Sequence, residues 1–245
     1  MATPTIVVIG CGAPSRFSPT IPGFGVGGHA VKIASEKGYN VRAVARNPDK
    51  YAQYYKDMPN VTMCKGDVKD AASIAECVKD ATCCLFAAQS NDNVSVYDID
   101  RDGLLIVAKE CLKANCKLVV ISSVYVSPKH YLNPLRFFFN RVVKWSMMDA
   151  KWEGEQAIRK LQGLKYTIIR PPRLTNDPEL RNAYQVTQGD NFWIGLRKIP
   201  KVDVAKVAVA ACVDPATDNT TFEVADSSSK LPQTTIGIFG KLKKV

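Results

Sequence analysis

Along the chain, short runs of β-branched and other apolar residues alternate with longer segments in which apolar positions recur every three or four residues. The short runs predict strands at residues 5–9, 41–45, 61–64, 83–88, 118–121, 166–169 and 221–224. The longer segments predict helices at residues 27–37, 71–79, 100–115, most of the second half of 125–164, and from an N-cap at Asp203 to Val213. Strands that alternate with helices are typical of a parallel sheet covered by crossover helices, so the pattern predicts an α/β, doubly wound fold.

The length of the chain fits a single domain. At 245 residues it accommodates one sizeable α/β domain, and two full domains would be cramped. Residues 1–172 hold the first six predicted strands and form the expected cofactor-binding core. Residues 173–245 are expected to add a late strand and a small C-terminal cap on the substrate side.

Composition narrows the class of protein. The hydrophobic fraction of 46% and the charged fraction of 23% are ordinary for a globular protein. No apolar run approaches the roughly 18 residues that span a bilayer, and the N-terminus lacks the basic region of a signal peptide. We therefore expect a cytoplasmic protein without a membrane partner. The eight cysteines form no CxxC pair, and with two histidines we expect buried free thiols and no metal site.

The net charge of +10 bears on the partners of the protein. Lys and Arg are spread along the chain, apart from a short cluster at residues 241–244, and they do not interleave with aromatic residues as in single-strand nucleic-acid binders. We therefore expect no nucleic-acid partner. A solvated surface together with a phosphate-rich small-molecule cofactor accounts better for this charge, which by itself does not identify a partner.

The first predicted strand leads into a glycine-containing segment that is typical of a phosphate-binding turn. Gly10 and Gly12 follow the strand, and Gly25 and Gly28 open the next helix. Glycines here allow a tight turn, a close approach of the backbone to a pyrophosphate and close packing of helix on strand, as in a Rossmann-type dinucleotide site. Compared with a GxxGxxG spacing, the loop before Gly25 holds 12 additional residues. A glycine-rich turn without a ligand is the alternative.

The end of the second predicted strand indicates which dinucleotide binds. NAD sites place Asp or Glu there, to accept a hydrogen bond from the ribose 2′-hydroxyl. This strand ends instead in Arg46, with Lys50 close behind. Because a guanidinium suits a 2′-phosphate, we expect NADP(H) as the cofactor and Arg46 as its phosphate ligand; a solvated arginine in a turn is the alternative. Asp67, after the third strand, is expected either to accept from the adenine amino group or to cap the next turn.

Five runs of residues carry a family signature. They are Gly-Leu-Lys-Tyr-Thr-Ile-Ile-Arg-Pro-Pro-Arg-Leu at 163–174, Arg-Asn-Pro-Asp-Lys at 46–50, Lys-Gly-Asp-Val at 65–68, and the segments 182–187 and 199–205. With these runs the chain resembles the atypical short-chain dehydrogenase/reductase superfamily, and within it the NmrA-like proteins and the biliverdin-IXβ/flavin reductases. The resemblance covers nearly the whole chain. It implies a Rossmann-type fold, an NAD(P) cofactor and a small-molecule substrate.

The resemblance also implies a catalytic set. In that superfamily a serine after the fifth strand acts with a Tyr-x-x-x-Lys pair on the next helix, where the lysine holds the nicotinamide ribose and lowers the pKa of the tyrosine. Ser123, or Ser122, matches the serine position, and Lys151 matches the lysine position. A solvated helix lysine is the alternative for Lys151. The tyrosine position is Met147, which cannot transfer a proton.

Two functions fit these residues. The first is an NADPH-dependent reductase that passes a hydride to a planar flavin-, quinone- or biliverdin-like acceptor beside residues 124–152, because such acceptors need mainly a well-positioned cofactor. Tyr125 and Tyr131 could replace the missing tyrosine only if the fold brings them to the site. The second is a non-catalytic NmrA-like protein that binds NADP(H) as a redox signal for a protein partner. A scaffold that has lost the cofactor is a third alternative, because the long loop before Gly25 could fill the pyrophosphate site.

Overall fold

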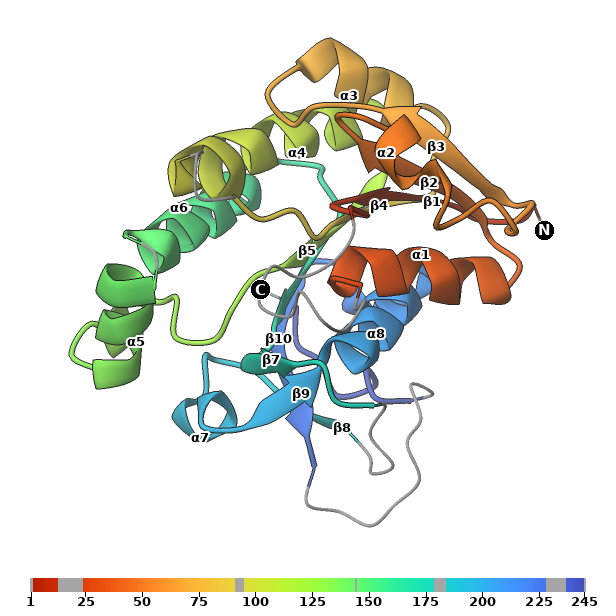
Figure 1. The fold of residues 1–245 in the computed structure, drawn as a ribbon. Coiled ribbons are helices and arrows are strands. Elements are labelled where there is room, and N and C mark those ends of the chain that lie inside the picture. Colours follow the sequence, from red (N-terminus) through yellow and green to blue (C-terminus); the bar gives the residue numbers. More distant parts are fainter. Residues whose placement is uncertain are drawn as a thin grey trace.

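Eight strands form one central sheet in the order β3-β2-β1-β4-β5-β6-β10-β8 (Figure 1). The computed structural model describes residues 2–12, 24–90, 95–143, 145–178, 184–227 and 237–244. The strands of this sheet are β1 (Thr5–Ile9), β2 (Asn40–Ala45), β3 (Val61–Lys65), β4 (Cys83–Phe86), β5 (Lys117–Ile121), β6 (Tyr166–Arg170), β8 (Tyr184–Thr187) and β10 (Thr220–Asp226). Neighbouring strands are parallel, except that β8 pairs antiparallel with β10 at one edge.

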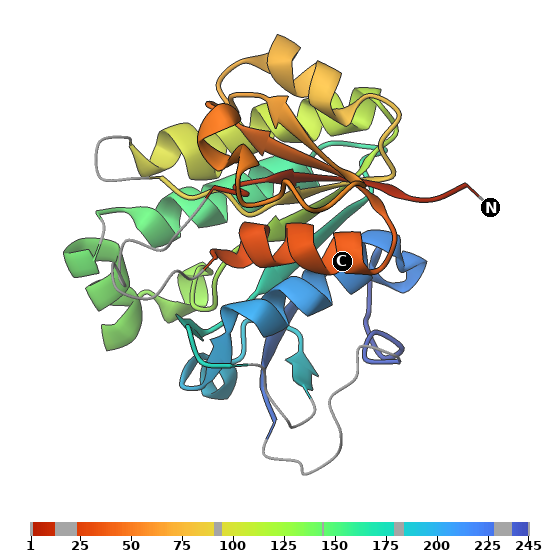
Figure 2. The same ribbon diagram turned by 45° about the vertical axis from the view of Figure 1, so that its right-hand side comes forward.

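A layer of helices covers each face of the sheet (Figures 1 and 2). On one face α1 (Val26–Glu36) packs against α8 (Lys201–Val213), and the other face carries α3 (Ala71–Val78), α4 (Leu104–Lys113) and α6 (Met147–Arg159). The shorter segments are α2 (Asp49–Ala52), η1 (Asp98–Gly103), η2 (Pro128–His130), α5 (Pro134–Phe138), η3 (Phe139–Val143), α7 (Phe192–Gly195) and η4 (Pro215–Thr217). The two layers confirm the predicted α/β, doubly wound, Rossmann-type sheet.

The two-sided cover explains why β1 is apolar at every position of its centre. Ile6 and Val8 face the layer of α1 and α8, whereas Val7 and Ile9 face the layer of α3 and α4. A strand that is covered on both faces has no polar side. The same burial accounts for the cysteines: seven of the eight are buried free thiols, as expected, and the eighth, Cys64, is half-buried.

Two helix starts differ from the sequence pattern. The helix predicted from residue 100 begins as the π-helical turns of η1, and regular α-helix follows from Leu104. The prediction of Asp203 as an N-cap is wrong, because α8 begins at Lys201, directly after Pro200. Asp203 is fully buried in the first turn, where its carboxylate accepts a hydrogen bond from the Tyr184 hydroxyl at 2.9 Å. Proline has a fixed φ and no N–H to donate, so it suits a helix start.

The residues after Pro172 divide between two parts of the structure. β7 (Arg173–Thr175) and β9 (Lys198–Pro200) pair as a separate two-stranded parallel sheet, with α7 before β9. α8, β8 and β10 belong instead to the central sheet and its helical cover, and β10 is the predicted late strand. Within the described ranges, no helix combines the length and the apolar character that crossing a bilayer requires.

Candidate dinucleotide and substrate site

The strand order reverses between β1 and β4. From β1 the chain runs outward through β2 to β3, and from β4 it runs the other way through β5 to β6. The register sets Ile9 beside Val44 on β2 and beside Phe86 on β4, so the carboxyl ends of these strands lie at one edge. In open parallel sheets ligands bind in the crevice at such a switch point.

Gly10 occupies the switch point, in a conformation that suits glycine. Its φ is +95°, and a Cβ there would lie 2.6 Å from the carbonyl carbon of Ala87, just after β4. Gly27, in the first turn of α1, lies against the same turn, because a Cβ at Gly27 would lie 2.4 Å from the Gly10 carbonyl oxygen. Helix and strand therefore meet through their backbones.

The other glycines of the segment have different surroundings. A Cβ at Gly28 would meet the ring of Phe24 at 2.4 Å, and one at Gly12 would lie 3.2 Å from the Tyr51 ring. Around Gly25, the N-cap of α1, no described atom lies within 4 Å of such a Cβ. Most of the predicted long loop, residues 13–23, lies outside the described residues. The sequence pattern named Gly28 for close helix–strand packing and missed Gly27, its neighbour.

The N-terminus of α1 can accept an anion. Its N-cap, Gly25, has no side chain that could cap the first N–H groups of the helix. Backbone N–H groups and the helix dipole make such an end favourable for phosphate. With Gly10 at the switch point and no described atom close to a Cβ at Gly25, the described backbone fits a pyrophosphate.

The two helix glycines make a matched pair for a stability test. Gly27→Ala is expected to lower the free energy of unfolding by about 2–3 kcal/mol, because the added methyl group meets backbone that cannot turn aside. Gly25→Ala, which adds the same methyl group in open space, is expected to change it by less than about 1 kcal/mol. Urea unfolding followed by circular dichroism measures both. Equal losses for the two variants would contradict the close contact between α1 and β1.

Arg46 directly follows β2 and lies at the same edge of the sheet as Gly10. Its side chain is exposed and makes no ion pair with any described residue. The next strand ends beside it, because the Gly66 N–H donates to the Ala45 carbonyl at 3.1 Å. Asp67 Oδ1 accepts from the Lys69 N–H at 3.0 Å, which is the turn-capping role expected for it as one of two alternatives.

The two candidate serines follow β5 and differ in their surroundings. Ser122 is buried, and its hydroxyl donates to Glu155 Oε1 at 2.6 Å. Ser123 is half-buried. Because Ser122 is already bonded to Glu155, the geometry favours Ser123 as the serine that meets a ligand.

Glu155 on α6 is the centre of a buried group of charges. It accepts from Arg170 Nε at 3.0 Å and pairs with a second nitrogen of the same guanidinium, while Arg159 lies 3.2 Å away. Burial disfavours the charged form of Arg170, but the Glu155 carboxylate outweighs this cost and raises the pKa of Arg170. The group fixes α6 to the end of β6.

Lys151 is buried and paired. Its ammonium nitrogen lies 2.7 Å from Asp100 Oδ1, and both side chains are less than a tenth exposed, so it is not a solvated helix lysine. A Cβ at Gly154, one turn further along α6, would lie 2.2 Å from the Asp100 carbonyl oxygen, so α6 and η1 touch through their backbones. A cavity of about 10 Å³, roughly enough for one water molecule, lies between Ser122, Lys151 and Glu155.

Neither candidate tyrosine is free to take the role of a tyrosine at Met147, the first residue of α6. Tyr125 is buried, and its hydroxyl donates to the Phe192 carbonyl at 2.9 Å. Burial raises the pKa of Tyr125, so its hydroxyl stays protonated and engaged. Tyr131 is 59% exposed and stands against the guanidinium of Arg136.

Asp190 holds the loop that follows the candidate serines. Its carboxylate accepts from the Tyr125 N–H at 2.8 Å, and from the Ser127 N–H and hydroxyl at 3.0 and 2.6 Å. Its own backbone has a φ of +56°, which is strained for a residue with a side chain. The sequence gives only a Gly-Asp turn as a signal for this position, and it identified neither Asp190 nor Asp100.

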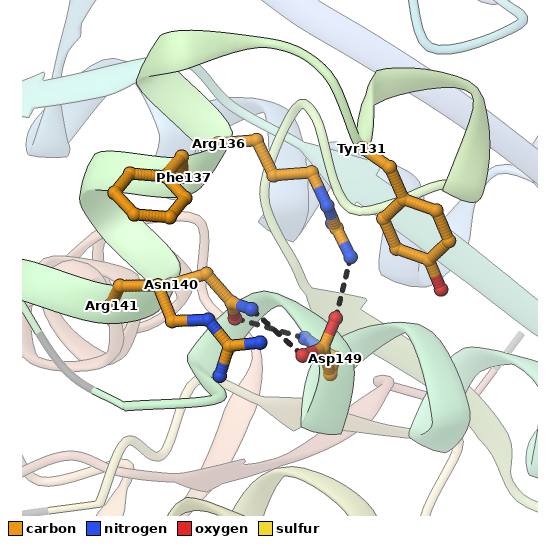
Figure 3. Close-up of a pocket in the computed structure, with 6 residues that line it drawn as sticks. All are labelled: Tyr131, Arg136, Phe137, Asn140, Arg141 and Asp149. Carbon is orange, nitrogen blue, oxygen red and sulfur yellow. Dashed lines mark hydrogen bonds and ion pairs between the residues drawn. The ribbon is translucent and has the colours of Figure 1, made fainter.

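Next to this loop lies an open hollow of about 280 Å³ between α5 and α6 (Figure 3). Its lining residues are Tyr131, Arg136, Phe137, Asn140, Arg141 and Asp149. Asp149 accepts from Arg136 at 2.6 Å and from Asn140 at 2.7 Å, so its charge is already satisfied.

A doubly wound parallel sheet with a glycine-lined switch point beside a helix N-terminus defines a Rossmann-type dinucleotide-binding protein. The chain matches the NAD(P)H-binding family over residues 25–215, and it belongs to this family. The membership confirms the cofactor class and the resemblance inferred from the sequence.

Several known proteins are similar to the chain over most of its length. An uncharacterized chloroplastic protein of Arabidopsis thaliana is 28% identical over 209 residues, which cover 82% of this chain and 71% of that protein. An oxidoreductase of Lactococcus lactis has a similar structure, with a TM-score of 0.71, 18% identity and 92% of each chain covered. The anaerobilin reductase ChuY of Escherichia coli O157:H7 has a TM-score of 0.70, with 18% identity over 94% of this chain and 100% of that one.

A short-chain dehydrogenase/reductase of Veillonella parvula, solved with NADP, has a TM-score of 0.69 and 14% identity over 96% of this chain and 99% of that one. At these identities the solved structures establish the shared fold.

Proposed function

We propose that the protein is an NADPH-dependent reductase that transfers a hydride to a small planar acceptor of the flavin, quinone or biliverdin type. Membership of the NAD(P)H-binding family supports the cofactor class. The similar structure of an anaerobilin reductase supports the reaction type, and that of a short-chain dehydrogenase/reductase solved with NADP supports the phosphorylated cofactor. The observation that carries the proposal is the position of Arg46, exposed at the end of β2 and one strand from Gly10.

The described residues fit NADP(H) part by part. Gly10 and the uncapped start of α1 would hold the pyrophosphate, and Arg46 would pair with the 2′-phosphate, where a carboxylate would repel it. Ser123, at the end of β5, would border the nicotinamide. When bound, NADPH supplies the hydride that reduces the acceptor.

The missing tyrosine supports an acceptor that needs little acid catalysis. With Met147 at the tyrosine position and the Tyr125 hydroxyl bonded to Phe192, neither side chain can protonate a carbonyl substrate. A planar conjugated acceptor spreads the negative charge that a hydride brings, and it can take its proton from water. The chain's contribution is then to position the two reactants and to exclude solvent.

A second function has an observation in its favour. The ammonium of Lys151 is engaged by Asp100 at 2.7 Å and the Ser122 hydroxyl by Glu155, and the cavity between Ser122, Lys151 and Glu155 has a volume of only about 10 Å³. This closed arrangement fits a protein that binds NADP(H) without consuming it and signals to a protein partner.

Oxidation of NADPH in the presence of flavin mononucleotide, a soluble quinone or biliverdin distinguishes the two functions. The reductase is expected to turn over at least one of these acceptors and to leave a simple aliphatic ketone unreduced. Ser123→Ala is expected to slow turnover about tenfold, with Ser35→Ala, equally half-buried but at the far end of α1, as the matched control. Tight NADPH binding without turnover of any acceptor would support the redox sensor, and failure to bind NADPH or NADH would overturn both functions.

A further inference from the structure

Exposed hydrophobic side chains gather in two segments of the protein. Of the twelve large hydrophobic side chains that are exposed in the described part of the chain, ten lie in residues 131–145 and 192–196. Leu132 is 99% exposed, Trp145 is 67% exposed and Trp193 is 72% exposed. Apolar side chains concentrated in this way mark a surface that contacts another molecule or a membrane.

The two segments lie at the same end of the molecule. Figures 1 and 2 both show α5 and α7 on the side opposite to the N-terminus. Tyr125 links them, because its hydroxyl donates to the Phe192 carbonyl and its ring packs on His130 with 5.0 Å between the centroids. We call residues 128–143, 145–147 and 191–198 together the tip.

The tip is anchored to the fold beneath it. Arg136 is buried, and its guanidinium donates to the carbonyls of Tyr125 and Val126 at 2.7 Å each and to Asp149 at 2.6 Å. His130 lies 2.7 Å from the Asp190 carbonyl. The exposed aromatic side chains of the tip therefore stand on backbone that is hydrogen-bonded to the rest of the fold.

The charge of the tip is of one sign. It contains five Lys and Arg residues and no Asp or Glu. Arg136 pairs with Asp149 and Lys198 with Asp177, both outside the tip. Arg141 is exposed, lies 4.3 Å from the Trp145 ring centroid, and pairs with no carboxylate among the described residues.

The Arg141 side chain lies at the hollow beside α5. Arg141 lines it together with the aromatic rings of Tyr131 and Phe137 (Figure 3). Because Arg136 and Asn140 are bonded to Asp149, Arg141 is the charge that remains for an anionic group entering the hollow.

We propose that the tip docks on the surface of an anionic phospholipid bilayer, with Trp145 and Trp193 in the boundary between headgroups and acyl chains and Arg141 paired with a headgroup phosphate. Trp and Tyr are enriched at that boundary because each side chain has a large apolar ring and a polar N–H or O–H group. Basic residues and a net charge of +10 add attraction to an anionic surface.

Charge argues against the other occupants of this surface. A second copy of the chain would bring two basic tips together, and like charges repel. An acidic protein partner would complement the positive charge of the tip. A bilayer, however, also accommodates a side chain as exposed as Leu132 without a pocket of matching shape. The expectation of no membrane partner was based on the lack of a spanning run, which does not bear on docking of this kind. The proposal is independent of the proposed reaction.

Co-sedimentation with vesicles tests the proposal on the full chain without cofactor or acceptor. We expect binding to phosphatidylcholine vesicles that contain about 30% phosphatidylserine, little binding to pure phosphatidylcholine, and release as salt rises. Trp145→Ala and Trp193→Ala are each expected to weaken binding on the order of tenfold. Arg141→Gln is expected to weaken it about fivefold, and the matched Lys109→Gln, exposed on α4, by less than twofold.

Three outcomes would overturn the proposal. One is equal binding to neutral and anionic vesicles or to neither. Another is an equal loss for Arg141→Gln and Lys109→Gln, which would assign the binding to net charge alone. The third is a protein that does not bind vesicles but forms a dimer in sedimentation velocity experiments, if Trp145→Ala dissociates that dimer. Circular dichroism of each variant checks that these surface substitutions leave the fold intact.

Discussion

Arg46→Ala is expected to weaken NADPH binding by about 10- to 100-fold, the value of a hydrogen-bonded pair between a guanidinium and a phosphate. NADH lacks the 2′-phosphate, so its binding is expected to change by less than about twofold. The preference for NADPH should therefore disappear. Calorimetric titration of wild type and variant with both nucleotides measures the four dissociation constants.

Lys37→Ala is the control for the loss of one positive charge. Lys37 is exposed at the far end of α1, at the opposite edge of the sheet from Gly10. If the two variants lose the same NADPH affinity, the effect is a general electrostatic one. If Arg46→Ala keeps the wild-type preference for NADPH, another residue reads the 2′-phosphate and the cofactor argument fails.

Glu155→Ala is expected to lower the free energy of unfolding by about 3–5 kcal/mol, because it leaves the buried guanidinium of Arg170 without its nearest carboxylate. Glu155 is 1% exposed, and the other carboxylates that act on Arg170 are Asp190, which lies 3.8 Å away, and the buried Glu223. For a chain of this length the melting temperature should fall by roughly 6–20 °C. Thermal and urea unfolding followed by circular dichroism measure the loss.

Glu153→Ala provides the matched control, two residues earlier on the same helix. Glu153 pairs with Arg101 at 3.2 Å, but both side chains are well exposed, so its loss is expected to cost less than about 1 kcal/mol. A second variant separates charge from packing. Glu155→Met combined with Arg170→Met should be more stable than Glu155→Met alone, because it leaves no unpaired charge on Arg170. The opposite order would show that packing, rather than the ion pair, holds this position.

Local patterns were sufficient to predict most of the fold. The apolar runs at residues 5–9 and 166–169 are buried on both faces, and burial of that kind leaves a plain signal in the sequence. The pairing of β7 with β9 was not predictable, since each strand has three residues and no alternation can show in so short a run. Asp203 was misread because aspartate is a good N-cap, whereas Pro200 had already started the helix.

The site was predictable as a set of positions but not as a set of contacts. The sequence identified Lys151 and Ser122, and the structure added their partners, Asp100 and Glu155, which lie 51 and 33 residues away along the chain. Contacts at such separations depend on how helices are seated on the sheet. The same is true of Gly27 and Gly28, because the rotation of α1 about its axis decides which of two adjacent glycines faces β1.

The contact between Gly154 and the Asp100 backbone has a consequence for the range of acceptors. Because α6 meets η1 with no side chain between them, neither element can slide along the other without steric overlap, and the pairing of Lys151 is fixed with them. One wall of the substrate side is therefore rigid. The loop at residues 125–127 is held as well, by Arg136 and Asp190, so acceptors of different outline must be met by the exposed side chains at residues 131–138 rather than by movement of the backbone.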